Sequence, residues 1–218
     1  MEAIHYLTTI AVAYLLGSLP TGFLAGKCRG IDIRTVGSGN MGATNVFRTL
    51  GKGWGIGVLL LDMLKGIGAC ILAPIVANAI QAMDGFEPGE SLHPLTILAG
   101  VCGILGHNYT CWLNFKGGKG IATTAGVLLI LIPKALGVAF ATWVLTFLIS
   151  RYVSLASIAA AAVLPFAAFF FERSPTMAAI TLGLSCMAIF KHRSNIARLR
   201  AGTEHRFGKT KKSEESNG

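Results

Sequence analysis

The sequence predicts an all-α fold: a polytopic membrane helical bundle of seven helices, made of five spans and a helical hairpin over residues 121–150. Three observations support this prediction. Hydrophobic residues fill 53% of the 218 positions and charged residues only 13%, with a mean hydropathy of +0.61, unlike a soluble globule. Several apolar stretches approach the ~20 residues that cross a bilayer. Basic residues gather between these stretches.

Residues 4–26 form the first predicted span. The run Gly17-Ser18-Leu19-Pro20 interrupts the span, and because proline removes a backbone donor, the helix is expected to kink there. The chain opens with Met1-Glu2-Ala3 and lacks a basic start, so we interpret this helix as retained rather than cleaved.

The next segment, 27–52, is basic and contains a single acid, Asp32. By the positive-inside rule the segment lies in the cytoplasm and the N-terminus outside. Its basic residues are Lys27, Arg29, Arg34, Arg48 and Lys52.

The second predicted span, 54–77, carries Asp62 and Lys65 on one helical face, three residues apart. Charge inside a membrane is costly, so two interpretations are open: an ion pair that fixes packing, or a direct functional role. The acidic connection 78–93 suits the outside face. A third span follows over 94–106, which leaves His107 near the cytoplasmic end.

The remaining topology follows from whether the number of membrane crossings is odd or even. The tail from Lys191 is strongly basic and must lie inside, but three single spans would place it outside. Pro133-Lys134 divides 121–150, so we interpret this stretch as a hairpin that returns Arg151 to the cytoplasm. Spans over 154–171 and 176–190 follow, and five or seven crossings give the same parity. With this topology, sixteen of the 19 basic residues lie inside.

Residues 1–207 are thus expected to form a single integral membrane domain, and 208–218 a disordered cytoplasmic tail. The predicted location is a membrane, with the N-terminus outside and the C-terminus inside. The basic residues behind the +9 net charge lie where the positive-inside rule places them, so no nucleic-acid partner is expected. The five cysteines are scattered without a CxxC pair, and no metal site is expected.

The stretch GSGNMGATNVFR, residues 37–48, is too polar for a packed core. Glycines allow neighbouring backbone N–H groups to converge on an anion, and Arg48 adds a planar charge suited to phosphate. The alternative is a flexible polar loop between helices. The residues expected to form this anion-binding loop are Gly37, Ser38, Gly39, Asn40, Gly42, Thr44 and Asn45.

A second loop, Lys116-Gly117-Gly118-Lys119-Gly120, precedes Ile121, where a helix can begin. A helix N-terminus after glycines offers unpaired N–H groups and a positive dipole end, both of which favour phosphate. The alternative is that these lysines only mark topology. Polar residues near the same face also include Ser154 and Ser157, and His192 and Asn195 below the last span.

These four segments predict a site where phosphorylated, water-soluble material meets something apolar. The GxGxxG match at 37–42 follows no strand, which excludes a dinucleotide fold. No His-x4-Asp pair is present, as acyltransferases using acyl-CoA or acyl-carrier protein would need. A transporter of a phosphorylated metabolite is the alternative function, although the chain has no internal repeat.

The sequence resembles the bacterial membrane acyl-phosphate:glycerol-3-phosphate acyltransferases. The matching motifs, which span all but the last residues, are GSLP at 17–20, GSGNMGATNVFR at 37–48, LLLDMLKG at 59–66, GHNYTCWLNFKGGKGIAT at 106–123, RYVSLASI at 151–158 and KHRSNIARLRAGTEHRF at 191–207. The resemblance implies a seven-helix enzyme that moves a fatty acyl group from acyl phosphate to the sn-1 hydroxyl of glycerol 3-phosphate. The products would be lysophosphatidic acid and phosphate, in the first acylation step of phospholipid synthesis.

The resemblance also implies roles for single residues and no cofactor, metal, CoA or carrier protein. The first family motif falls on Ser38 and Arg48, the second on Gly117, Gly118 and Lys119, and the third on His192, Asn195 and Glu204. A further family serine matches Ser157 best, with Ser154 as the neighbouring alternative.

The chemistry suits these motifs because an acyl phosphate is a mixed anhydride with a good leaving group. Either His192 or a substrate phosphate can take the hydroxyl proton, and the resemblance favours the phosphate. The sequence leaves open the acyl chain length, the oligomeric state and whether a soluble acyl-phosphate-producing enzyme docks on the basic face.

Overall fold

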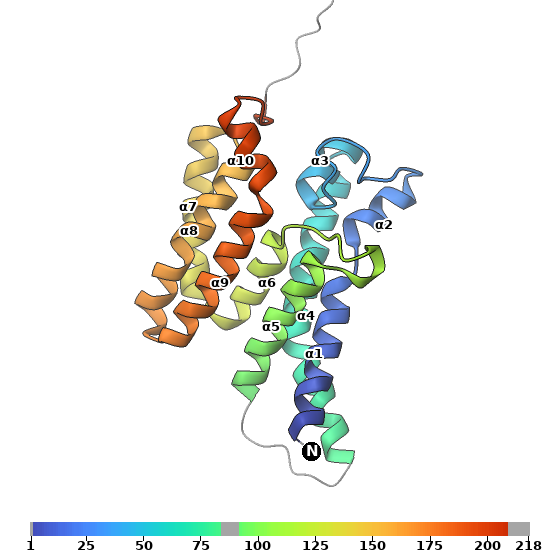
Figure 1. Cartoon of the computed structure of the whole chain (residues 1–218), viewed down its shortest axis with the longest axis vertical. Coiled ribbons are helices and arrows are strands. Elements are labelled where there is room, and N and C mark those ends of the chain that lie inside the picture. The colour runs from blue at the N-terminus through green and yellow to red at the C-terminus, as the bar shows by residue number, and fades with distance from the viewer. Residues whose placement is uncertain (1, 84–91, 209–218) are drawn as a thin grey trace, which may run out of the picture. The chain divides into compact units, whose positions relative to one another are not determined.

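Figure 1 shows the computed structural model of the chain, which describes residues 2–83 and 92–208. The regular elements in this part of the chain are all helical, as predicted. They are α1 (Glu2–Ser18), α2 (Thr21–Cys28), α3 (Ala43–Leu50), α4 (Lys52–Met83), α5 (Leu92–Asn108), the 3-10 helix η1 (Cys111–Leu113), α6 (Ile121–Leu131), α7 (Pro133–Ser150), α8 (Val153–Glu172), α9 (Pro175–Lys191) and α10 (Arg193–Arg200).

The predicted break in the first span is confirmed, since α1 ends at Ser18 and α2 begins at Thr21. Counting these two helices together, four segments are long and apolar enough to cross a membrane: 3–28, 52–80, 133–150 and 153–172. Helices α6 and α9 are apolar but shorter. The 121–150 stretch divides at Ile132, next to the expected Pro133, although full crossing by its two helices stays a prediction. Half of the acidic connection 78–93, including Asp84, Glu87 and Glu90, lies outside the described residues.

The chain falls into two compact units, Met1–Pro133 and Lys134–Gly218, and each is described here by itself. The expected single domain over 1–207 therefore stays a prediction. Of the expected disordered tail, 209–218 lie outside the described residues.

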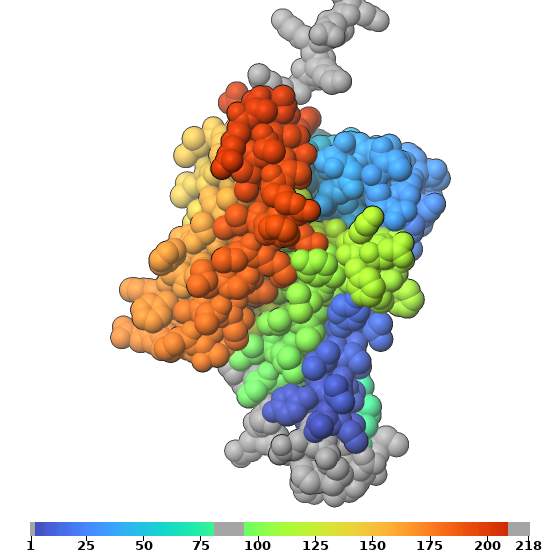
Figure 2. All heavy atoms as spheres, viewed as in Figure 1, coloured from blue at the N-terminus to red at the C-terminus, as the bar shows by residue number. Residues whose placement is uncertain are grey.

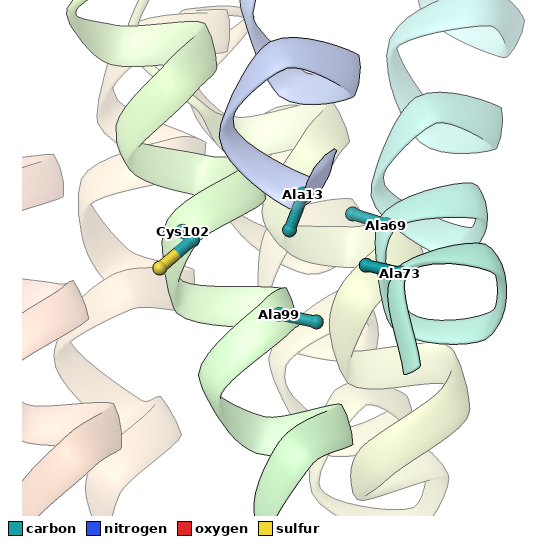
Figure 3. Close-up of a cluster of buried hydrophobic side chains, with 5 residues drawn as sticks. All are labelled: Ala13, Ala69, Ala73, Ala99 and Cys102. Atoms are coloured by element: carbon teal, nitrogen blue, oxygen red, sulfur yellow. The ribbon is translucent and has the colours of Figure 1, made fainter. Parts of the chain in front are cut away.

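Small side chains allow the helices of the first unit to pack closely. Figure 3 shows a buried cluster from α1, α4 and α5: Ala13, Ala69, Ala73, Ala99 and Cys102. Nearby, a Cβ on Gly17 would overlap the backbone of Gly103. Helices in lipid associate through such close backbone approach, because the hydrophobic effect contributes little to association between helices that are already out of water.

Large apolar side chains lie on the outside of the second unit. Ile149 is 81% exposed and Phe166 75% exposed. The α8 and α9 helices, orange in Figure 2, form part of the molecular surface. Exposed aromatic and aliphatic side chains on an apolar helix indicate a surface that faces lipid.

The polar stretch 37–48 is more ordered than predicted. Its second half forms α3, whose Val46 is fully buried, and Met41 is buried as well. Both belong to a small core with Ala25, Ile33 and Val58. The expectation that this stretch makes no packed core was therefore wrong, because one apolar residue per helical turn is enough to hold a short helix on α4.

Candidate functional site

The loop before α3 is held in shape by glycines and by Asn45. Gly37 and Gly39 have positive φ angles of 61° and 68°, which L side chains rarely adopt. The Asn45 side chain donates from Nδ2 to Ile33 O and Val36 O, both at 3.1 Å, and its Oδ1 accepts from Ser38 N at 2.8 Å. Asn45 thus fixes the backbone that carries Ser38.

Asn40 plays a similar local part, since its Oδ1 accepts from Gly42 N at 2.7 Å. Gly42 then begins α3 as its N-cap. The contacts described for Asn40 and Asn45 lie within residues 33–45, and the expected substrate-binding role of both residues remains a prediction.

Ser38 is exposed in this loop, and Arg48 is half-buried in the last turn of α3. Thr44 and Arg48 are four residues apart and share one face of α3. The loop therefore presents a hydroxyl and the helix a guanidinium, the two kinds of donor that a phosphate accepts from.

The glycine-lysine loop lies against the end of α5. Gly118 N donates to His107 O at 3.0 Å, and Gly117 N to Asn108 O at 3.2 Å. These bonds satisfy carbonyls that the helix end leaves without intrahelical partners. A Cβ on Gly117 would overlap His107 O, and a Cβ on Gly118 would overlap His107 Nε2. Both positions therefore require glycine.

Helix α6 begins at Ile121, as predicted, with Gly120 as its N-cap. Lys119 is half-buried immediately before that N-terminus. Its charge is therefore close to the positive end of the helix dipole, an arrangement that favours an anion.

The two loops belong to one part of the first unit. Leu113, between α5 and α6, packs against the small core that contains Met41 and Val46. A Cβ on Gly22 of α2 would overlap Met41 O, so α2 also packs directly against the anion-binding loop.

The second unit holds the other predicted residues, and Glu204 is their centre. Its Oε1 accepts from Ser154 Oγ at 2.9 Å and from Asn195 Nδ2 at 2.8 Å, while Oε2 accepts from Arg198 Nε at 2.7 Å. Burial opposes ionisation of Glu204, but these hydrogen bonds outweigh it and lower the pKa of the carboxyl.

His192 and Ser157 have separate partners. His192 Nδ1 lies 2.8 Å from Ala188 O, and because a carbonyl only accepts, Nδ1 carries the hydrogen in the neutral ring and Nε2 is an acceptor. Ser157 Oγ donates to Val153 O and accepts from Trp143 Nε1 at 3.2 Å. Of the two alternative serines, only Ser154 joins the Glu204 cluster through the contacts described here.

Arg198 was missed by sequence reasoning, which assigned the tail's charge to topology. A usable signal existed, because Asn195 and Arg198 are three residues apart on a short helix and share a face. Within residues 2–83 and 92–208, no group of three His, Cys, Asp or Glu residues is arranged to hold a metal.

The Glu204 cluster leads to a stability prediction. We expect Glu204→Gln to lower the Tm at pH 7, with a shift of about 2–4 °C for each kcal/mol lost. The deficit relative to wild type should shrink as the pH falls below the ordinary glutamate value of 4.5. The pKa of Glu204 is lower in the folded protein than in the unfolded one, so its ionised form stabilises the fold at any pH above the unfolded-state value. That stabilisation is lost as the pH falls and the carboxylate of the folded protein takes up a proton. Thermal unfolding in detergent, followed by tryptophan fluorescence, measures it.

Glu172→Gln is the matched control, since Glu172 is exposed at the end of α8. A Glu204→Gln deficit that is the same at pH 7 and at about pH 3.5 would contradict the ionised cluster.

Helices of this length and apolarity define a multi-pass membrane protein, whose first unit carries donors suited to phosphate in the loop before α3 and in the loop before α6. A family model described as glycerol-3-phosphate acyltransferase matches residues 7–202. The chain belongs to the glycerol-3-phosphate acyltransferase family.

Individual relatives match over nearly the whole chain. The glycerol-3-phosphate acyltransferase of Geobacter sulfurreducens is 44% identical over 204 residues, covering 94% of this chain and 98% of that protein. That of Geotalea daltonii is 45% identical over 195 residues, covering 89% and 94%.

Two solved crystal structures of PlsY (YgiH), an integral membrane glycerol 3-phosphate acyltransferase, are also similar. The glycerol 3-phosphate form has a TM-score of 0.79 and 38% identity, over 93% of this chain and 96% of that one. The lysophosphatidic acid form has a TM-score of 0.75 and 37% identity, over 93% and 95%.

Proposed function

We propose that this protein transfers a fatty acyl group from acyl phosphate to the sn-1 hydroxyl of glycerol 3-phosphate, giving lysophosphatidic acid and inorganic phosphate. The observation that carries the proposal is the match over residues 7–202 to this family, together with the similar structures in glycerol 3-phosphate and lysophosphatidic acid forms. The reaction would be the first acylation of phospholipid synthesis.

The proposed chemistry needs mainly positioning. The glycerol hydroxyl oxygen attacks the acyl carbonyl carbon, the bond from that carbon to the phosphate oxygen breaks, and phosphate leaves with the electron pair. Two groups can accept the hydroxyl proton: the departing phosphate and His192 Nε2, which is the acceptor nitrogen of the neutral ring when Nδ1 donates to Ala188 O.

The residues divide between the two substrates. Ser38 and the loop backbone, held by Asn45, hold the phosphate of the donor, where negative charge grows as the bond breaks. Arg48 and Lys119 hold the phosphate of the acceptor, aided by the start of α6. Glu204 holds Asn195 and Ser154 in place.

The cellular setting is part of the same proposal. The protein lies in the bacterial inner membrane with its N-terminus outside and with its C-terminus and site facing the cytoplasm, as the basic segments favour. Acyl phosphate comes from a soluble enzyme that docks on the basic face, because a reactive mixed anhydride is best handed over at the membrane surface.

Cysteine labelling tests the orientation. We expect single cysteines at Asn40, Lys119 and Ser194, in a background without native cysteines, to react with an impermeant thiol reagent only when the cytoplasmic face is open. A cysteine at Glu172, exposed at the other end of α8, should react in intact cells. Labelling at Asn40 or Ser194 from outside would reverse the proposed topology.

The experiment for the function itself uses purified protein, both substrates and a phosphate-release assay with detection of lysophosphatidic acid. Phosphate release that depends on glycerol 3-phosphate is expected. Uptake of glycerol 3-phosphate into proteoliposomes without acyl transfer would instead identify a transporter.

A further inference from the structure

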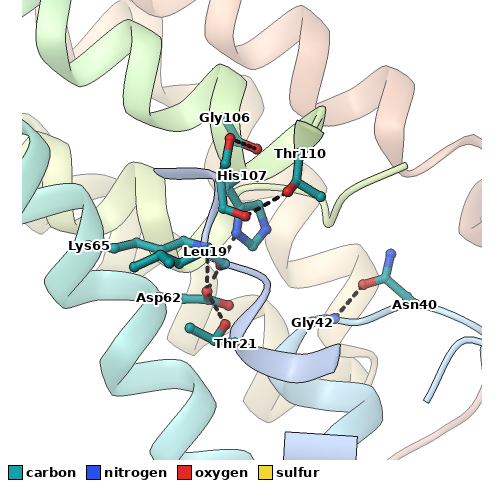
Figure 4. A network of polar contacts seen from close by, with 10 residues as sticks. Leu19, Thr21, Asn40, Gly42, Asp62, Lys65, Gly106, His107 and Thr110 are labelled. Atoms are coloured by element: carbon teal, nitrogen blue, oxygen red, sulfur yellow. Dashed lines mark hydrogen bonds and ion pairs between the residues drawn. The ribbon is translucent and has the colours of Figure 1, made fainter. Parts of the chain in front are cut away.

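A buried polar cluster lies beneath the glycine-lysine loop, within the apolar part of the first unit. Figure 4 shows Asp62 and Lys65 of α4 beside Leu19, Thr21 and His107. The side chains of Asp62 and Lys65 are 3% and 5% exposed, and Lys65 Nζ lies 2.9 Å from Asp62 Oδ1. Such a pair is costly to bury, so its other contacts are informative.

One side of the cluster holds the break between α1 and α2. Lys65 Nζ donates to Leu19 O at 2.7 Å, and Thr21 Oγ1 donates to Asp62 Oδ1 at 2.6 Å. Leu19 lies in the interruption, and its carbonyl also accepts from Thr21 N at 3.0 Å. The Lys65 ammonium of the ion pair therefore adds a second hydrogen bond to a carbonyl within the interruption.

The other side of the cluster reaches the glycine-lysine loop through His107. Asp62 Oδ1 lies 3.5 Å from His107 Nδ1. The opposite ring nitrogen, Nε2, packs directly against Gly118, where a Cβ would overlap it. The same residue accepts from Gly118 N through its carbonyl at 3.0 Å. Gly118 is thus held by both the ring and the backbone of His107, directly before Lys119.

A second connection runs in parallel. Thr110 Oγ1 donates to Ser18 O at 2.6 Å, and Ser18 Oγ lies 3.4 Å from Gly106 O. The end of α1 is therefore fastened to the end of α5 on both sides of His107. The position of the glycine-lysine loop depends on the same broken helix that Lys65 and Asp62 stabilise.

We propose that Asp62, Lys65 and His107 are positioning residues that fix Gly117, Gly118 and Lys119 for the phosphate of glycerol 3-phosphate. This rests on the proposed function of that loop as the acceptor site. The three residues do not touch substrate, and they act through the His107–Gly118 contact. A buried ion pair contributes little net stability compared with an apolar pair of the same volume, so a positioning role accounts for it better than packing.

Two substitutions at His107 separate positioning from packing. His107→Leu removes the ring nitrogens and keeps a side chain of comparable bulk. His107→Asn retains a polar group at the place of Nδ1, which faces Asp62. We expect His107→Leu to raise KM for glycerol 3-phosphate about 10-fold, the equivalent of one net hydrogen bond, and His107→Asn to recover most of that loss. KM for acyl phosphate should stay within about threefold in both.

A second variant tests the same series of contacts at the ion pair, the end farthest from Lys119. Asp62→Asn combined with Lys65→Met removes both charges together and leaves neither unpaired. It should raise KM for glycerol 3-phosphate in the same selective way. Hydrogen exchange gives a readout independent of activity: amides of the loop from 116 to 120 should exchange faster in His107→Leu than in wild type, while amides within α4 stay protected.

Unchanged KM for glycerol 3-phosphate in folded His107→Leu, or equal rises for both substrates with no recovery in His107→Asn, would overturn the positioning role. Failure of the proposed function looks different, because wild type would then release no phosphate on addition of glycerol 3-phosphate. Loop amides that exchange alike in wild type and His107→Leu would overturn the inference even in that case.

Discussion

Ser38→Ala should reduce turnover with acyl phosphate by about 10²–10³, the usual loss for one donor aimed at developing charge. Ser38 is exposed in its loop, and Asn45 fixes its backbone N–H, so the hydroxyl is the group that the substitution removes. Steady-state phosphate release at saturating glycerol 3-phosphate measures the effect.

Thr35→Ala is the matched control. Thr35 is an exposed hydroxyl residue three positions earlier, and its Oγ1 donates to Asp32 O within the turn. We expect its turnover to stay within about twofold of wild type. Full activity in folded Ser38→Ala would remove Ser38 from the mechanism.

The choice of acyl donor provides a second test of the role of this loop. The loop suits a small anion, whereas acyl-CoA has a bulky nucleotide and a thiolate leaving group. Acyl-CoA should therefore give little or no lysophosphatidic acid under conditions where acyl phosphate reacts. Equal product from both donors would show that the loop does not select the leaving group.

Lys119→Ala should lower kcat/KM for glycerol 3-phosphate by about 10- to 150-fold, because a charge-assisted contact contributes roughly 1.5–3 kcal/mol. Lys119 immediately precedes the N-cap of α6, and Gly118 beside it is held by His107. Phosphate release at varied glycerol 3-phosphate and fixed acyl phosphate measures this.

Lys116→Ala provides a close comparison, since Lys116 is an exposed lysine of the same loop three residues upstream. Its kcat/KM should stay within about twofold. If both lysine variants behave alike, the charge acts through the general potential of the face and not through a specific contact.

Local rules predicted the features that depend on neighbouring residues. Pro20 lacks a donor, and α1 ends two residues before it. Gly120 precedes Ile121, where α6 begins. Asp62 and Lys65, three residues apart, form the expected ion pair. In each case the cause lies within one helical turn.

Contacts between distant segments could not be predicted in this way. The bonds from Asn45 to Ile33 O and from Ser154 to Glu204 join residues 12 and 50 positions apart. The sequence could not show that Ser154, and not Ser157, bonds Glu204, because the two serines look alike in sequence. Likewise, α3 was missed because its burial comes from α4 and from the loop around Ile33.

The Lys65–Leu19 contact also bears on how the protein is made. During synthesis the first span reaches the bilayer before α4 exists, so its interrupted backbone meets lipid without the Lys65 ammonium that later donates to Leu19 O. Asp62 and Lys65 reach the membrane together on one helical turn and partly neutralise each other. We therefore expect the first span to reach its final conformation only when α4 inserts beside it. The two segments of the N-terminal half would then fold into the membrane together.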